Sequence, residues 1–390
     1  MTARPILILA AHFALSVLLA ALTGLIGYRV FDGALETAQA EHLQAYIRVR
    51  ADREQRVFQD ARTLNRAAEL AFRRRLDALE GQSIEDDFDR LFPLHGDGTR
   101  RSAPDLFDGT HLPYGDYVFG VGAFMADGGE MTDAEKRRYL AAFQTVRSVG
   151  EAFLGKFTSL YFFTPDRRMV MFAPEREDRL TFYRIDAPAD FDLRGDEDAA
   201  LFDLHLNPNS DMQCTRLSRF VYSDDGERAA SACRQPVRDG DVLLGAFGTS
   251  ISMNDTLASA LETPPSHGVN MLFDRDGAVI SRGTEAPGGA ATPLAPESII
   301  EMLGQDPRPF GVFVAPDGVH MIAFSRIPGP SWYFVSVVEL SPIREAARLW
   351  AWTMFALVLF ASLSFAILRA LVVRTYPLRR KLPPEAADAG

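Results

Sequence analysis

Two long apolar segments, one near each end of the chain, limit what this sequence can fold into. Residues 6–27 and residues 349–368 contain 22 and 20 residues without a formal charge. At about 1.5 Å of rise per residue, each segment is long enough as a helix to cross a hydrocarbon core of about 30 Å. The intervening residues 31–345 must then lie on one side of a membrane. This layout is typical of a transmembrane receptor rather than of a soluble enzyme.

Charged residues beside the two apolar segments predict their orientation. Five cations follow the second segment: Arg369, Arg374, Arg379, Arg380 and Lys381. A cation-rich flank stays in the cytoplasm, and the short N-terminal stub with Arg4 points the same way. We therefore expect a two-span protein of the cell inner membrane, with both termini cytoplasmic and residues 31–345 periplasmic. The alternative for the first segment is a cleaved signal peptide, although its apolar stretch exceeds the usual length of roughly 7–15 residues.

The block between the apolar segments is acidic. It holds 33 basic and 50 acidic residues, a net charge of −17, against −11 for the whole chain. Such a surface argues against nucleic acid or anionic lipid as a partner of this block.

Cys214 and Cys233 are the only cysteines, and both lie in the acidic block. No Cys-x-x-Cys or His-rich spacing indicates a metal site, and we expect no cofactor. Strand patterns at residues 214–222 and 228–236 flank a Ser-Asp-Asp-Gly turn, which is typical of a hairpin. A disulfide follows if the two cysteines face each other on these paired strands.

The pattern of apolar residues predicts an α+β fold. Apolar residues three and four apart from Val57 to Leu79 indicate one face of a long stalk helix, and residues 133–154 a second helix capped at Thr132 or Asp133. Alternating or compact apolar runs predict strands at 117–124, 158–163, 169–172, 214–222, 228–236, 242–253, 268–273, 278–281, 310–315, 319–326 and 332–339, with a short helix at 296–303. Residues 81–129 and 180–208 are expected to be mostly loop. A helix followed by an antiparallel sheet thus occurs twice.

Several segments resemble the double Cache (PAS-like) sensor domain of bacterial receptors and sensor kinases. Residues 157–174 (FTSLYFFTPDRRMVMFAP) resemble the first hairpin of its membrane-distal module, and residues 330–335 (PSWYFV) resemble the strand that closes the membrane-proximal module. Residues 189–193 and 207–208 resemble the loop over the binding site, and residues 235–237, 239–240 and 245–248 the end of the distal sheet.

The resemblance implies a division of the chain into an N-terminal stub and first span (1–30), a stalk helix (31–80), a distal Cache module (81–262), a proximal Cache module (263–345), a second span (346–373) and a cytoplasmic tail (374–390). It also implies an extracytoplasmic, ligand-sensing receptor subunit that forms a homodimer. Family members usually continue into a kinase, cyclase or chemotaxis signalling domain. This sequence has 17 residues after Val373, so we expect either a piece of a longer receptor or signalling to a separate cytoplasmic protein of the histidine kinase or diguanylate cyclase type.

By the same resemblance, a ligand would lie between the distal sheet and its covering loop. The expected contact residues are Tyr161, Arg179, Tyr183, Arg216, Tyr222, Arg234 and Ser250. Amino-acid binders of the family carry an Asp where Ser250 stands, together with an Arg-x-Trp pair that is missing here. We therefore expect a small anion or a neutral polar molecule rather than an α-amino acid. Pairing of the arginines with nearby aspartates is the alternative.

Catalytic motifs do not occur in the sequence. There is no Gly-x-Ser-x-Gly, no His-Glu-x-x-His and no phosphate-binding Gly-rich loop, and the seven histidines are scattered. We expect no enzymatic activity. A membrane-anchored envelope scaffold with a Cache fold and no ligand is the remaining alternative, and it predicts a sheet face filled by Phe and Met side chains.

Overall fold

The computed structural model describes residues 3–126, 128–129, 131–157, 159–164, 169–173, 182–191, 198–219, 229–252, 261–274, 276–284 and 294–375. Its helical elements are α1 (Ala3–Ala78), α2 (Glu85–Leu91), α3 (Asp105–Asp108), α4 (Asp133–Ala152), the π-helical turn η1 (Phe182–Asp186), α6 (Asp198–Phe202), α8 (Pro296–Gly304) and α9 (Ser341–Thr375). The strands are β1 (Arg100–Arg101), β2 (Thr110–His111), β3 (Tyr117–Val118), β4 (Gly122–Met125), β5 (Leu160–Phe163), β6 (Met169–Ala173), β7 (Gln213–Cys214), β8 (Ser218–Arg219), β9 (Ala229–Asp239), β10 (Val242–Ser252), β11 (Gly268–Phe273), β12 (Val279–Arg282), β13 (Phe310–Val314), β14 (His320–Ile327) and β15 (Trp332–Glu339). The fold class is therefore α+β, as the sequence predicts.

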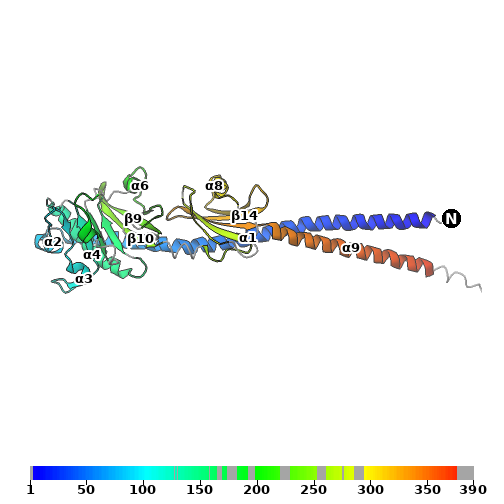
Figure 1. The fold of residues 1–390 in the computed structure, drawn as a ribbon, viewed down its shortest axis with the longest axis horizontal. Coiled ribbons are helices and arrows are strands. Elements are labelled where there is room, and N and C mark those ends of the chain that lie inside the picture. The colour runs from blue at the N-terminus through cyan, green and yellow to red at the C-terminus, as the bar shows by residue number, and fades with distance from the viewer. Residues whose placement is uncertain are drawn as a thin grey trace, which may run out of the picture. The chain divides into compact units, whose positions relative to one another are not determined.

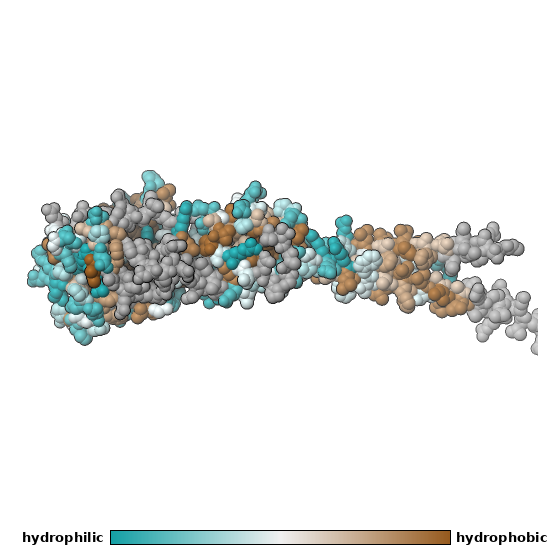
Figure 2. Space-filling model, viewed as in Figure 1, coloured by the Kyte–Doolittle hydropathy of each residue, from teal (hydrophilic) through white to brown (hydrophobic). Residues whose placement is uncertain are grey.

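The chain divides into two compact units, residues 1–45, 312–323 and 338–390, and residues 46–311 and 324–337. The first unit contains both apolar segments, each inside a helix that is long and apolar enough to cross a membrane. Figure 2 shows their described residues as an apolar surface. Within this unit α1 and α9 approach closely at Gly24, where an added Cβ would lie 3.3 Å from the Cβ of Phe355.

Helix α1 combines the predicted first span and the predicted stalk in one uninterrupted helix of 76 residues (Figure 1). No glycine or proline interrupts residues 34–78, so nothing in the sequence breaks the backbone hydrogen bonds there. Three side chains of its predicted apolar face, Leu64, Ala68 and Phe72, are fully buried. The sequence pattern thus identified the packing face correctly.

The larger sheet has eight strands in the order β1-β4-β6-β5-β10-β9-β7, with β8 paired to β9. One face, here called the helix face, packs against α1: the Phe72 ring lies 5.3 Å from the Phe162 ring and 5.6 Å from the Phe247 ring. Burying each of these side chains contributes about 1.5–3 kcal/mol to folding. Because side chains alternate along strands, the neighbours of Phe162 and Phe247 point to the opposite face.

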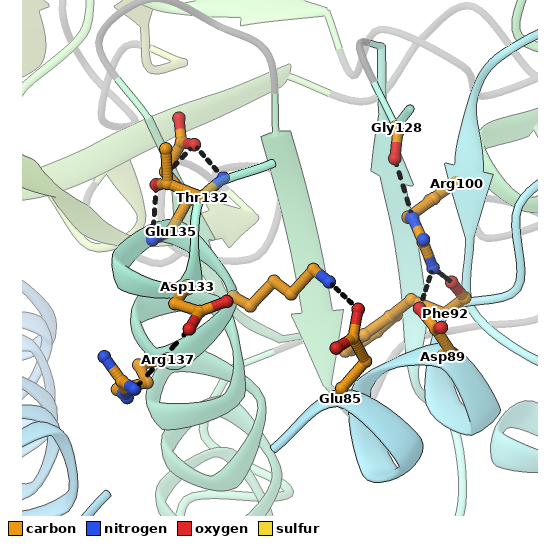
Figure 3. A network of polar contacts seen from close by, with 10 residues as sticks. Glu85, Asp89, Phe92, Arg100, Gly128, Thr132, Asp133, Glu135 and Arg137 are labelled. Carbon is orange, nitrogen blue, oxygen red and sulfur yellow. Dashed lines mark hydrogen bonds and ion pairs between the residues drawn. The ribbon is translucent and has the colours of Figure 1, made fainter. Parts of the chain in front are cut away.

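Helix α4 begins with a complete capping box. The Thr132 hydroxyl accepts a hydrogen bond from the Glu135 backbone N–H, and the Glu135 carboxylate accepts one from the Thr132 N–H (Figure 3). Such a cap is worth about 1 kcal/mol and fixes where the helix starts. The helix packs against β5 and β6. Its bounds, Asp133–Ala152, lie within two residues of those predicted.

The smaller sheet has five strands in the order β12-β11-β15-β14-β13. Strand β15 has the bounds predicted from the sequence. Its Trp332 is fully buried and meets Phe58 of α1 edge-on, with 5.6 Å between the ring centroids.

Three sequence predictions need correction. The strand predicted at 117–124 is two strands, β3 and β4, in different sheets, and Gly120 between them has φ +65°. In its described part, residues 214–219, the strand predicted at 214–222 is broken between β7 and β8, and residues 220–222 lie outside the described residues. The segments predicted to be mostly loop contain α2, β1, α3 and β2 in residues 81–129, and η1 and α6 in residues 180–208. These elements span two to seven residues each, too few for an apolar period to show.

Candidate functional site

The face of the eight-stranded sheet opposite α1, here called the cap face, carries three of the predicted site residues. Gly248 of β10 pairs with Tyr161 of β5 on one side and with Arg234 of β9 on the other. Residues in register on neighbouring strands share a face, so Tyr161 and Arg234 point to the same side. Ser250, two residues after Gly248, shares this face and pairs with Ala232.

Tyr161 and Arg234 contact each other across β10. The Arg234 Nε donates to the Tyr161 Oη over 3.3 Å, and the Arg234 guanidinium carbon lies 5.3 Å from the centre of the Phe163 ring. Gly248 makes this contact possible, because a Cβ at that position would come within 2.5 Å of the Tyr161 ring. Tyr161 is buried and Arg234 is half-buried. The pair therefore presents a cation and a phenol side by side on the sheet.

Two described segments, 182–191 and 198–202, cover this face and are here called the cap. Their side chains form one apolar cluster with those of the sheet: Phe124, Tyr161, Phe163, Val170, Phe172, Phe182, Tyr183, Ala187, Phe191, Leu201, Phe202 and Ala246. Tyr183 belongs to the π-helical turn η1, a rare element that is frequent at functional sites. Its ring lies 5.0 Å from the Phe172 ring. The structure thus brings Tyr183 onto the same face as Tyr161.

Arg216 is not brought to the cap face. It follows β7, its side chain is 57% exposed, and its Nη2 lies 2.7 Å from Oδ2 of Asp276. The remaining two predicted contact residues, Arg179 and Tyr222, lie outside the described residues.

A charged residue of the cap face was missed by sequence reasoning. Arg101 of β1 has a side chain that is only 5% exposed, and its guanidinium carbon lies 5.2 Å above the centre of the Phe124 ring. Its Nη2 donates to the Ala187 carbonyl of the cap over 2.6 Å. A two-residue strand in a stretch expected to be loop gives no periodic signal that could have identified it.

The predicted disulfide is confirmed. Cys214 of β7 and Cys233 of β9 are bonded, in register, with 3.9 Å between their Cα atoms. Cys233 points to the helix face, and its carbonyl accepts a hydrogen bond from Asn65 of α1 over 3.1 Å. The bond thus fixes β7 to β9 one residue away from Arg234.

Chemically, the cap face combines an apolar aromatic surface with a small number of polar groups. A guanidinium beside a phenol and a serine hydroxyl can hold a carboxylate or another polar oxygen. The aromatic rings of the cap can cover an apolar body of moderate size. This is the usual composition of a small-molecule site.

No protein-family model matches the chain, and no curated protein matches its sequence. The chain is similar to the ligand-binding domain of the Pseudomonas fluorescens chemoreceptor CtaA in complex with L-isoleucine, at 15% identity and a TM-score of 0.42 over 80% of this chain and 98% of that chain. It is also similar to the sensory domain of the Campylobacter jejuni chemoreceptor Tlp3, at 10% identity and a TM-score of 0.46 over 81% and 99% of the two chains. Both neighbours are ligand-binding or sensory domains of bacterial chemoreceptors, the kind of receptor domain that the sequence resemblance predicts.

Proposed function

We propose that this chain is a ligand-sensing membrane receptor subunit that binds a small molecule on the cap face and signals to a separate cytoplasmic protein, without catalysis of its own. The observation that carries the proposal is the half-buried Arg234 guanidinium beside the Tyr161 hydroxyl, under an aromatic cap. Holding a cation and a phenol side by side at the edge of an apolar cluster has a desolvation cost. An anionic or polar ligand would offset that cost by adding charge-assisted hydrogen bonds.

The proposed ligand is a small carboxylate or a neutral polar molecule. Ser250 supplies a hydroxyl on β10 where amino-acid binders of the family have a carboxylate, so the ammonium group of an α-amino acid would lack that counter-charge. Arg234 would bind the polar head of the ligand, and the rings of Tyr161 and Tyr183 would contact its body.

The proposed topology has two spans, both termini in the cytoplasm and residues 31–345 in the periplasm. Support comes from the two long apolar helices and from the cation-rich sequence after the second one. We propose a distal module of residues 81–262 and a proximal module of residues 263–345, in a homodimer. Because α1 is a single helix, a ligand that favours one of two arrangements of the cap could bias a two-state equilibrium along it.

One observation favours the alternative, an envelope scaffold that binds no ligand. The rings of Tyr161, Phe163, Tyr183 and Phe191 crowd over the sheet, as a filled face would require. A scaffold would keep its partners when the cap face is altered, whereas a sensor would lose its response.

The test is a dose–response measurement in cells, with histidine-kinase phosphorylation and cyclic dinucleotide level as the two outputs. Small carboxylates and polyols are added to cells with the wild-type chain, Arg234→Met or the control Arg90→Met, which removes an exposed ion pair with Asp87 on α2. We expect at least one compound to alter one of the two outputs at the same concentration in wild-type and Arg90→Met cells. In Arg234→Met cells the same change in output should need at least a ten-fold higher concentration of that compound. Equal dose–response curves in all three would overturn the proposal.

A further inference from the structure

Arg101 is a buried cation that bonds both to the cap and to its own segment. Besides its bond to the Ala187 carbonyl, its Nη1 lies 3.5 Å from the Tyr183 carbonyl oxygen. On its own segment, its Nε donates to the Thr99 hydroxyl over 3.2 Å and its Nη2 pairs with Asp97 Oδ2 at 3.4 Å. The sheet register places it on the cap face, since Arg101 pairs with Phe124, which pairs with Val170.

Because of these contacts, the hydrogen bonding of the Arg101 guanidinium depends on the position of the cap, and the position of the cap depends on Arg101. A buried guanidinium left without acceptors is strongly unfavourable. The two backbone carbonyls that it reaches lie at the start and just beyond the end of the π-helical turn, at Tyr183 and Ala187. The Phe124 ring under the guanidinium fixes its height above the sheet. If residues 183–187 moved away, Arg101 would keep Asp97 and Thr99 but lose both cap acceptors.

We infer that Arg101 is a positioning residue of the ligand site: it holds η1 so that Tyr183 lies on the cap face, and so sets which ligand bodies fit beneath the cap. This inference rests on the proposed function, because it assigns a role within that same site. Arg101 itself need not touch the ligand, since its donors are directed at backbone carbonyls of the cap and at its own segment.

The adjacent residue provides a matched control. Arg100 is equally a buried arginine of β1, but its Nε donates to the Gly128 carbonyl over 2.7 Å and its Nη1 to the Phe92 carbonyl over 2.8 Å and to Asp89 over 2.6 Å (Figure 3). Asp89 lies in α2, Phe92 directly follows it, and Gly128 lies in the segment after β4. Removing Arg100 should therefore loosen the sheet edge without releasing η1.

The experiment is hydrogen–deuterium exchange of the full chain in nanodiscs, without ligand, comparing wild type with Arg101→Met, Arg101→Lys and Arg100→Met. The reporters are the amides of Ala187 and Phe191, which donate to Phe182 and Pro188 carbonyls at 2.8 and 3.0 Å. We expect Arg101→Met to raise exchange at both at least ten-fold, Arg101→Lys to raise it less, and Arg100→Met to leave it near wild type. Exchange in β10 (Val242–Ser252) should stay unchanged in Arg101→Met.

Two outcomes would overturn the inference: unchanged exchange at Ala187 and Phe191 in Arg101→Met, or an equal rise in β10, which would mean a general loss of stability. A second arm titrates sodium benzoate and sodium acetate into the same proteins. We expect wild type to bind one of the two probes more tightly than the other. A changed ratio of benzoate affinity to acetate affinity in Arg101→Lys would support the inference that Arg101 sets which ligand bodies fit beneath the cap. Failure of wild type to bind either probe counts against the ligand chemistry proposed above, while the exchange arm alone decides whether Arg101 positions the cap.

Discussion

The Arg234 Nε lies 3.3 Å from the Tyr161 Oη although β10 separates their two strands. Side chains two strands apart in a sheet are about 9.5 Å apart at their Cα atoms, so only long side chains that lean toward each other can meet. The residue between them is Gly248, and its missing side chain leaves the room in which the Tyr161 ring lies.

Replacing Gly248 by alanine should therefore disturb the site and the sheet together. The new Cβ would meet the Tyr161 ring at 2.5 Å, and overpacking of this kind costs about 1–3 kcal/mol. We expect a lower thermal unfolding temperature for Gly248→Ala, measured in detergent. Gly304→Ala serves as control, because among the described residues no atom outside the neighbouring backbone of its own helix lies within 4 Å of the added Cβ. The double variant Gly248→Ala/Tyr161→Ala should lose less stability than the sum of the losses in the two single variants, because removing the ring removes the clash. A loss equal to that sum would contradict the clash.

The disulfide predicts a stability difference that depends on the redox state. It closes a loop with a sequence separation of 19, which corresponds to about 3 kcal/mol in the loop-entropy model. The double variant Cys214→Ala/Cys233→Ala should lose about that much unfolding free energy, and wild type under reducing conditions should lose a similar amount. If reduction left wild-type stability unchanged while mass spectrometry showed both thiols free, the stabilising role would be refuted.

Glu54 on α1 predicts a pH dependence. Its side chain is buried, and among the described residues Oε1 has no hydrogen-bond partner, although the Arg53 Nε lies 3.6 Å from it as an ion pair. Burial raises the pKa of this carboxyl, and the charges of Arg53 and Arg50 oppose that shift only in part. Between the unfolded and the folded pKa the folded chain holds more of the proton than the unfolded chain. The unfolding free energy therefore falls as pH rises through this window.

Glu54→Gln should accordingly be more stable than wild type at neutral pH, by a few degrees in unfolding temperature if the gain is about 1 kcal/mol. The difference should shrink as pH is lowered toward about 4, near the ordinary pKa of glutamate. The exposed Glu80→Gln is the control and should follow wild type throughout. If Glu54→Gln were no more stable than wild type at neutral pH, burial of the charged Glu54 carboxylate would not lower the unfolding free energy, and the prediction would be refuted.

Local signals in the sequence were sufficient for much of the fold. Helix α4 was predicted because Thr132 and Glu135 form a cap that depends on neighbouring residues only. Strand β15 carries an eight-residue run between clear turn residues, and its bounds were predicted without error. The cysteine pair was predicted from its symmetric placement about a turn.

The composition of the cap face depends on contacts distant in sequence, which local patterns do not report. Arg216 falls in the break between β7 and β8, so the continuous strand that would have aimed it at the site does not exist. Arg101 bonds to a carbonyl 86 residues away, and Gly248 matters because of a ring on another strand. Arg234 and Tyr161 lie in segments that the sequence predicted as strands, the eleven-residue β9 and the four-residue β5, and the register of these strands with β10 brings the two side chains to one face.

The most direct test of the ligand-binding claim is isothermal titration of the purified full chain in nanodiscs with a panel of small carboxylates, polyols and α-amino acids. We predict that a carboxylate or neutral polar compound binds wild type, and that Arg234→Met weakens its binding at least ten-fold, since a charge-assisted hydrogen bond contributes about 1.5–3 kcal/mol. The exposed Arg90→Met should bind as wild type does. Binding of α-amino acids alone, with an affinity that Arg234→Met leaves unchanged, would contradict the account.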